Sequence, residues 1–167
     1  MFVLGIDPGL TRCGYGAVVQ RAGGRTEAVA AGVLATPAAA PLAERLAELQ
    51  AGLRRLMGEL RPDAVAVERV FFTANARTAM GVGQASGLAL AEAAAAGCEV
   101  AQYTPNEVKV AVAGAGEAPK EQVTRMVQSL LGLPAPPRPA DAADALALAL
   151  CHLASARLRR QVEKVSR

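Results

Sequence analysis

The sequence predicts an α/β protein with a five-stranded mixed sheet flanked by helices. The order of apolar strand-like runs and helix-period segments is three strands, a helix, a strand, a helix, a strand and then further helices. The helix between the third and fourth strands makes a parallel crossover natural. With 167 residues, 52% hydrophobic and 20% charged, the chain can bury a substantial core as one domain.

The first half of the chain supplies four of the strands. An apolar run at 2–6 is stopped by Asp7-Pro8-Gly9, which is typical of a strand entering a turn. Runs at 13–21 and 26–35 are joined by a Gly-Gly pair and predict a hairpin. A helix is predicted over 41–60 because leucines recur there with a period near 3.6. The run 64–67 predicts a buried strand, ended by Glu68.

The second half is mainly helical. Residues 75–96 are rich in small residues, and their glycines predict a helix packed closely against another helix. The sequence then predicts a fifth strand over 98–103 and two helices over 104–114 and 119–132. A proline-rich link leads to a last helix from Asp141 to about Arg160. We expect one domain over 1–156 and a basic, frayed tail over 157–167.

Composition restricts the class of protein. The net charge of +3 and a pI near 9.0 are compatible with a nucleic-acid partner. Cys13, Cys98 and Cys151 form no C-x-x-C motif, which favours free thiols in a reducing compartment. The N-terminus lacks a basic signal-peptide region, and no apolar run is long enough to span a membrane. We therefore expect a cytoplasmic protein without membrane segments.

Four acidic residues stand where chemistry is expected. Asp7 and Glu68 each end a buried strand, and ligand sites in α/β sheets lie beyond the carboxyl ends of strands. Asp141 and Asp144 share one face at the start of the last helix. Structural roles are open to each of them: Asp7 could begin a turn, Glu68 could be the first solvated residue, and the other two could cap a helix or complement its dipole.

A metal site would explain the four acids together. Converging carboxylates repel one another unless a cation neutralises them. Oxygen ligands without a cysteine or histidine pattern indicate Mg²⁺ or Mn²⁺ and not zinc. Two such ions roughly 3.5–4 Å apart can activate a water molecule and stabilise the departing oxygen of a phosphodiester. The lone histidine, His152, lies in an apolar stretch, and we expect it to have a packing or surface role.

Further candidates lie around these acids. Phe71 and Phe72 stand side by side just after Glu68; in a strand one ring could be core and the other exposed, or both could pack under a loop. Arg69, Asn75 and Arg77 frame this loop and could contact phosphates or bases, although exposed arginines are common. The candidate lysines are Lys109 and Lys120. Lys120 opens a helix, where a cation opposes the helix dipole, and this favours a functional reason for its presence.

Six motifs occur in order and together resemble the RuvC family of Holliday junction resolvases: GIDPG, AVERVF with NARTA, GQASG, VKVAVAGAGEAPKEQV and DAADALALAL. The resemblance spans Phe2 to about His152. It implies a ribonuclease H-like fold, a homodimer with part of its contact on 75–96, and paired symmetric nicks across a four-way DNA junction in recombination and repair. It also implies cooperation with the RuvA–RuvB branch-migration machinery.

The resemblance also implies roles for single residues. Asp7, Glu68, Asp141 and Asp144 match the metal-binding carboxylates, with two ions of Mg²⁺ or Mn²⁺ per site, and some members carry histidine at the position of Asp141. Lys109 and Lys120 match residues that approach the scissile phosphate, and Phe71 matches the residue that stacks on an unpaired base. Two rival functions are a phosphotransferase of the actin and sugar-kinase type and a module that binds junctions without cutting them.

Overall fold

A computed structural model describes the backbone of residues 1–70 and 76–165 and the side chains of 1–70 and 79–158. Its sheet has the strand order β3-β2-β1-β4-β5, in which β1, β2 and β3 are antiparallel and β1, β4 and β5 are parallel. This confirms the predicted five-stranded mixed sheet. The strands are β1 (Phe2–Asp7), β2 (Arg12–Gln20), β3 (Thr26–Ala35), β4 (Ala64–Glu68) and β5 (Glu99–Tyr103).

The predicted helices are all present, and the structure differs from the prediction in two places. A short 3-10 turn at Ala22–Gly24 connects β2 to β3. The last helix continues to Val165, whereas the sequence predicted an end near Arg160. The helices are α1 (Leu42–Leu60), α2 (Ala76–Ala95), α3 (Pro105–Ala113), α4 (Lys120–Leu131) and α5 (Ala140–Val165).

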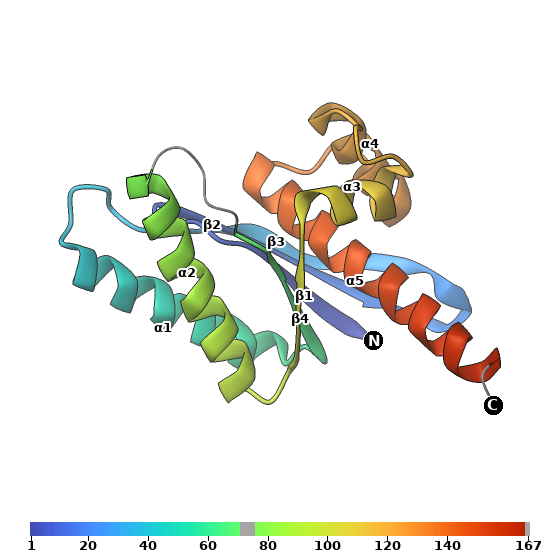
Figure 1. Cartoon of the computed structure of the whole chain (residues 1–167), viewed down its shortest axis with the longest axis horizontal. Helices are drawn as coiled ribbons and strands as arrows, with labels where there is room; N and C mark the ends of the chain where they lie inside the picture. Colours follow the sequence, from blue (N-terminus) through green and yellow to red (C-terminus); the bar gives the residue numbers. More distant parts are fainter. Residues whose placement is uncertain (71–75, 166–167) are drawn as a thin grey trace.

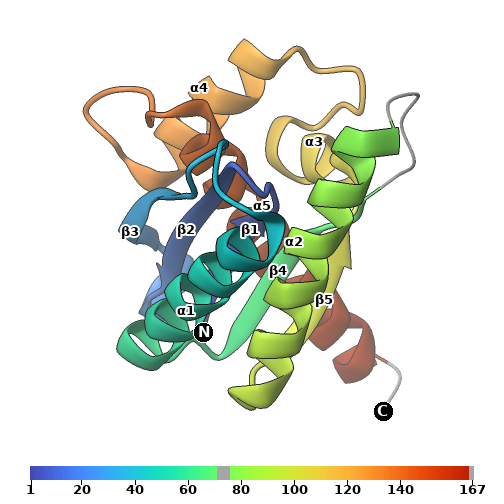
Figure 2. The ribbon, with the colours of Figure 1, turned by 90° about the vertical axis from the view of Figure 1, so that its left-hand side faces the viewer.

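The sheet lies between two helical layers (Figure 1). Helices α1 and α2 cover one face, as the turned view shows (Figure 2), and α5 crosses the other face with α3 and α4 beyond it. The buried side chains divide in the same way, because Leu4 and Ile6 of β1 pack toward α1 and α2, whereas Val3 belongs to the core formed with α5. This alternation along β1 is what a strand buried on both faces requires.

Glycines allow α5 to lie directly against the sheet. A Cβ atom on Gly5 of β1 would lie 1.9 Å from the carbonyl oxygen of Ala145. A Cβ atom on Gly14 of β2 would lie 2.2 Å from the carbonyl oxygen of Asp141. Both strands therefore need glycine where α5 crosses them. This close crossing brings the first turn of α5 beside the end of β1.

The start of α3 follows a local sequence signal. Thr104 and Glu107 form a capping box at the start of α3, in which each side chain accepts a hydrogen bond from the backbone N–H of the other residue. Among the described residues, none of the helices is sufficiently long and apolar to cross a membrane.

Candidate active site

Strand pairing brings Asp7 and Glu68 together. β1 and β4 are parallel neighbours, and Ile6 lies opposite Val67, so the next residue of each strand ends the sheet at the same edge. The side chains of Asp7 and Glu68 share a hydrogen bond. Burial, this bond and the negative charges of Glu68, Asp144 and Asp141 raise the pKa of Asp7 to about 8. When no cation is present, this raised pKa favours the protonated form of Asp7 beside Glu68.

The first turns of α5 supply the other two acids. Arg12 donates to Oδ2 of Asp141 from Nε at 3.0 Å and from Nη2 at 2.8 Å. The Nζ atom of Lys120 donates to Oδ2 of Asp144 at 2.6 Å. Asp141 lies inside the helix, which begins at Ala140, so it is not the N-cap residue. Its described side-chain partner is a guanidinium and not a backbone N–H of its own helix.

A cavity of about 260 Å³ at this edge of the sheet is lined by acids and lysines. Glu68 and Asp144 line it together with Lys109 and Lys120, and the rest of its wall is apolar. The hydrogen bond to Asp144 raises the pKa of Lys120, with the nearby charges of Asp144, Asp7 and Asp141 acting in the same direction. Lys120 is therefore a firmly charged cation beside the carboxylates. The apolar residues of the wall are Pro105, Val108, Val123, Ala147 and Leu148.

The predicted DNA contacts are only partly described. Phe71, Phe72 and Asn75, as well as the side chain of Arg77, lie outside the described residues. Arg69 is exposed directly after β4, and its backbone N–H donates to the carbonyl oxygen of Tyr103 at 2.8 Å. This bond continues the pairing of β4 with β5, so Arg69 lies at the same edge of the sheet as Asp7 and Glu68.

Sequence reasoning missed Arg12. It begins β2, and that strand runs antiparallel to β1, so Arg12 lies near the end of β1 that carries Asp7. No motif marks an arginine at this place. Only the antiparallel turn after GIDPG, taken together with the placement of α5 across both strands, could have indicated its contact with Asp141.

The histidine and cysteines have the structural roles expected of them. His152 is fully buried, and its Nδ1 atom lies 3.0 Å from the hydroxyl oxygen of Tyr103. Cys13, Cys98 and Cys151 are free thiols. Burial raises the pKa values of Cys13 and Cys151 to about 11, which leaves both thiols protonated and unreactive at neutral pH.

Comparisons with known proteins give matches over most of the chain. A family model described as "Crossover junction endodeoxyribonuclease RuvC" matches residues 3–152. The protein of that name from Moorella thermoacetica is 52% identical over 166 residues, which is 99% of each chain. The one from Parafrankia is 56% identical over 153 residues, covering 92% of this chain and 86% of the relative.

Solved structures give the same result. The structure of Thermus thermophilus RuvC matches with a TM-score of 0.88 and 42% identity, covering 95% of this chain and 96% of the other. The structure of T. thermophilus RuvC in complex with a Holliday junction substrate matches with a TM-score of 0.89 at the same identity and coverage. These matches confirm the ribonuclease H-like fold. The yeast mitochondrial Holliday junction resolvase Ydc2 shares the fold with a TM-score of 0.69 at 15% identity.

Proposed function

Because the chain belongs to the RuvC family of crossover junction endodeoxyribonucleases, we propose that it resolves four-way DNA junctions by paired symmetric nicks, in recombination and repair. The observation that carries the proposal is the meeting of Asp7 and Glu68 at one sheet edge. Asp144 and Lys120 are bonded to each other and line a cavity together with Glu68. A pure junction-binding module has no need to concentrate acids beside the phosphates that it must hold.

The carboxylate set fits divalent cations. Within the described residues, no three acids are already arranged as a metal site, because Asp141 is turned to Arg12 and Asp144 to Lys120. Burial and the neighbouring acids raise the pKa of Asp7, and a cation bound beside it would favour its ionised form. We assign two ions of Mg²⁺ or Mn²⁺ to Asp7, Glu68, Asp141 and Asp144, whose oxygens are the ligands that these ions prefer.

Bound ions of this kind supply Lewis-acid activation of water and of the phosphodiester. The residues of the chain position the strand and balance its charge. If Asp144 held a cation, Lys120 would be available to donate to a phosphate oxygen, and Lys109 lines the same cavity. Both lysines would stabilise the negative charge that develops on the scissile phosphate. The expected products carry 5′-phosphate and 3′-hydroxyl ends.

The proposal extends to the wider assembly. A homodimer would place two such sites about a two-fold axis, so that two strands of like polarity are cut. We assign part of the dimer contact to α2 and base stacking to Phe71, supported by Arg69, Asn75 and Arg77. The same proposal places the nuclease domain over 1–156 and gives the basic tail non-specific contacts with phosphates. It also includes cooperation with RuvA–RuvB in the cytoplasm.

Cleavage mapping tests the function. An end-labelled four-way junction and a linear duplex of matching arm sequence are incubated with the protein in Mg²⁺ and then in Mn²⁺. We expect paired nicks confined to the junction and their loss in Asp141→Asn. Junction binding without nicks in either metal would indicate a binding module. Tight ATP binding by calorimetry would favour the phosphotransferase.

A further inference from the structure

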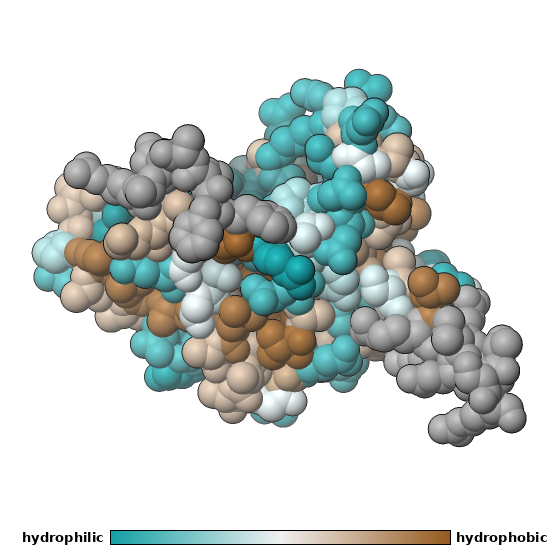
Figure 3. Space-filling view, in the orientation of Figure 1, coloured by the Kyte–Doolittle hydropathy of each residue, from teal (hydrophilic) through white to brown (hydrophobic). Residues whose placement is uncertain are grey.

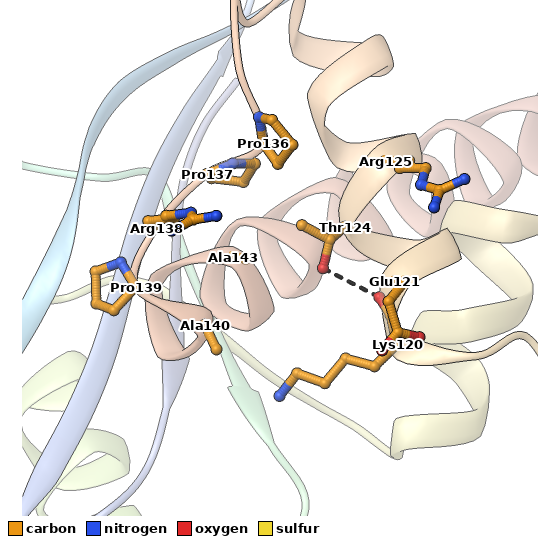
Figure 4. A pocket seen from close by; sticks show the side chains of 10 residues that line it. All are labelled: Lys120, Glu121, Thr124, Arg125, Pro136, Pro137, Arg138, Pro139, Ala140 and Ala143. Atoms are coloured by element: carbon orange, nitrogen blue, oxygen red, sulfur yellow. Dashed lines mark hydrogen bonds between the residues drawn. The ribbon is translucent and has the colours of Figure 1, made fainter.

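A second, larger cavity adjoins the catalytic one. It has a volume of about 860 Å³ and lies between α4, the proline segment 136–139 and the first turn of α5 (Figure 4). Prolines and alanines supply much of its lining. The lining residues named in Figure 4 also include three cations, Lys120, Arg125 and Arg138, against the single carboxylate of Glu121. The cavity is thus an apolar groove with a net positive rim.

The groove is continuous with the candidate active site. Lys120 lines both cavities, and its Nζ atom is bonded to Asp144 at 2.6 Å. Ala140 and Ala143 of the groove lie on the turns of α5 that also carry Asp141 and Asp144. The groove therefore begins within one side chain of the carboxylates.

Arg138 is the cation best placed to act in this groove. Figure 4 shows its side chain directed from the proline segment toward the space between that segment and α4. It is exposed, and it forms no ion pair or side-chain hydrogen bond within the part of the chain that the structure describes. Other arginines near the acids differ in this respect, since Arg12 is bonded to Asp141.

The backbone around Arg138 is stiff. Pro137 precedes it and Pro139 follows it, so proline rings fix the neighbouring φ angles and restrict Arg138 itself to extended conformations. A guanidinium on such a segment loses little backbone entropy when it binds. It presents a planar set of donors that suits a phosphate, which it can bind with two parallel hydrogen bonds.

We propose that this groove binds the DNA backbone next to the scissile phosphate, with Arg138 contacting a flanking phosphate and the prolines and alanines contacting deoxyribose. The inference rests on the proposed nuclease function and specifies where the cleaved DNA strand runs beside the active site. Charge complementarity and continuity with the active site support it. The positive ends of α4 and α5, which begin at Lys120 and Ala140 on the groove wall, favour the same ligand.

The surface around the groove is also suited to nucleic acid. Figure 3 shows hydrophilic residues gathered over α4, the helix that forms one wall. The exposed large hydrophobic side chain of this helix, Leu130, lies near its C-terminal end, whereas the groove is lined by residues 120–125 near its start. A polar wall with an apolar floor matches the alternation of phosphate and sugar along a DNA strand.

The test compares the salt dependence of junction binding for wild type and Arg138→Gln, by fluorescence anisotropy of a labelled four-way junction in EDTA. Each phosphate contact contributes roughly 0.9 to the slope of log K against log salt. We expect Arg138→Gln to lower this slope by about one, so that its affinity deficit shrinks roughly 3-fold to 4-fold between 50 and 200 mM salt. Arg138→Lys should keep the slope of wild type.

Arg55→Gln is the matched control, because it makes the same chemical change at an exposed arginine of α1 that does not line the groove. We expect its slope to equal that of wild type. At saturating protein, Arg138→Gln should cleave the junction in a single turnover at the wild-type rate, because Arg138 positions the strand and does not contact the reacting atoms. Only the protein concentration that gives half of this rate should increase.

The outcomes separate this inference from the proposed function. Wild type that binds and cuts the junction, with equal slopes for Arg138→Gln and Arg55→Gln, would overturn the groove and leave the nuclease assignment standing. Wild type that neither prefers the junction to duplex nor cuts it would overturn the function itself. A slower saturated rate for Arg138→Gln would contradict the assignment to a flanking phosphate.

Discussion

Replacing Asp7 with asparagine should make the metal-free protein more stable at alkaline pH, even though it removes a residue of the proposed active site. Asp7 shares a hydrogen bond with Glu68, and burial and three neighbouring acids raise its pKa from 3.8 to about 8. Asparagine keeps the size of the side chain and a hydrogen-bond donor without the charge. Residues that are placed for function commonly destabilise the fold in this way.

The magnitude follows from proton linkage. Between pH 3.8 and about 8 the folded protein holds a proton on Asp7 that the unfolded chain has released, so the free energy of unfolding falls as the pH rises. The full slope is about 1.4 kcal/mol per pH unit, and it halves where the folded group is half ionised. From pH 6 to pH 8 the loss amounts to about 2 kcal/mol, or roughly 4–8 °C in melting temperature for a chain of this size. The Asp7→Asn variant has no such proton to lose.

The assay is thermal unfolding in EDTA at pH 6 and pH 8, followed by far-UV circular dichroism. Between pH 6 and pH 8, the free energy of unfolding of wild type should fall by about 2 kcal/mol more than that of Asp7→Asn. Glu48→Gln is the control, since it makes the same chemical change at an exposed carboxylate of α1. Its pH dependence should match that of wild type. Mg²⁺ at pH 8 should raise the melting temperature of wild type and leave that of Asp7→Asn nearly unchanged.

The reasoning fails if wild type and Asp7→Asn lose the same stability between pH 6 and pH 8. That result would mean that Asp7 is ionised in the folded protein without a metal, and that the acids are not crowded as the geometry indicates.

Three further substitutions test other parts of the site. Lys120→Gln should slow saturated junction cleavage about 100-fold with the melting temperature within about 3 °C of wild type, and a near-normal rate would exclude a role at the phosphate. Gly5→Ala should destabilise the fold by more than about 3 kcal/mol in urea unfolding, because the methyl group meets the α5 backbone, and a loss under 1 kcal/mol would refute the close crossing. Arg12→Gln should tighten Mn²⁺ binding up to about 5-fold in calorimetry by releasing Asp141, whereas weaker binding would show that Arg12 supports the metal site.

Local patterns were sufficient to predict most of the fold. Strand β1 ends at the Asp7-Pro8-Gly9 turn, and α1 follows its leucine period, because each depends on residues adjacent in the chain. The extension of α5 to Val165 was not predicted. Its amphipathic period weakens after the apolar stretch, and helix continuation through a charged segment depends on weak propensities that a sequence pattern does not resolve.

The positions of the four candidate acids at one edge of the sheet could be predicted because strand ends and a helix start mark them in the sequence. Their cationic partners could not all be predicted. Lys120 was recognised from its unfavourable place at a helix start, but the contact of Arg12 with Asp141 joins residues 129 positions apart. That contact exists only because Gly5 and Gly14 let α5 cross β1 and β2 closely, and a pattern of small residues does not reveal which helix fills the space.

The most direct test of the account is the single-turnover rate of junction cleavage in Mn²⁺ by Glu68→Gln, with wild type and Glu48→Gln alongside and junction binding measured on the same samples. Glu68 ends β4 beside Asp7, whereas Glu48 is exposed on α1. We predict that Glu68→Gln binds the junction but cuts it at least 100-fold more slowly than both references, a loss of the size expected when a group acting on the transition state is removed. A rate within about 10-fold of wild type would contradict the placement of the catalytic centre at this edge of the sheet.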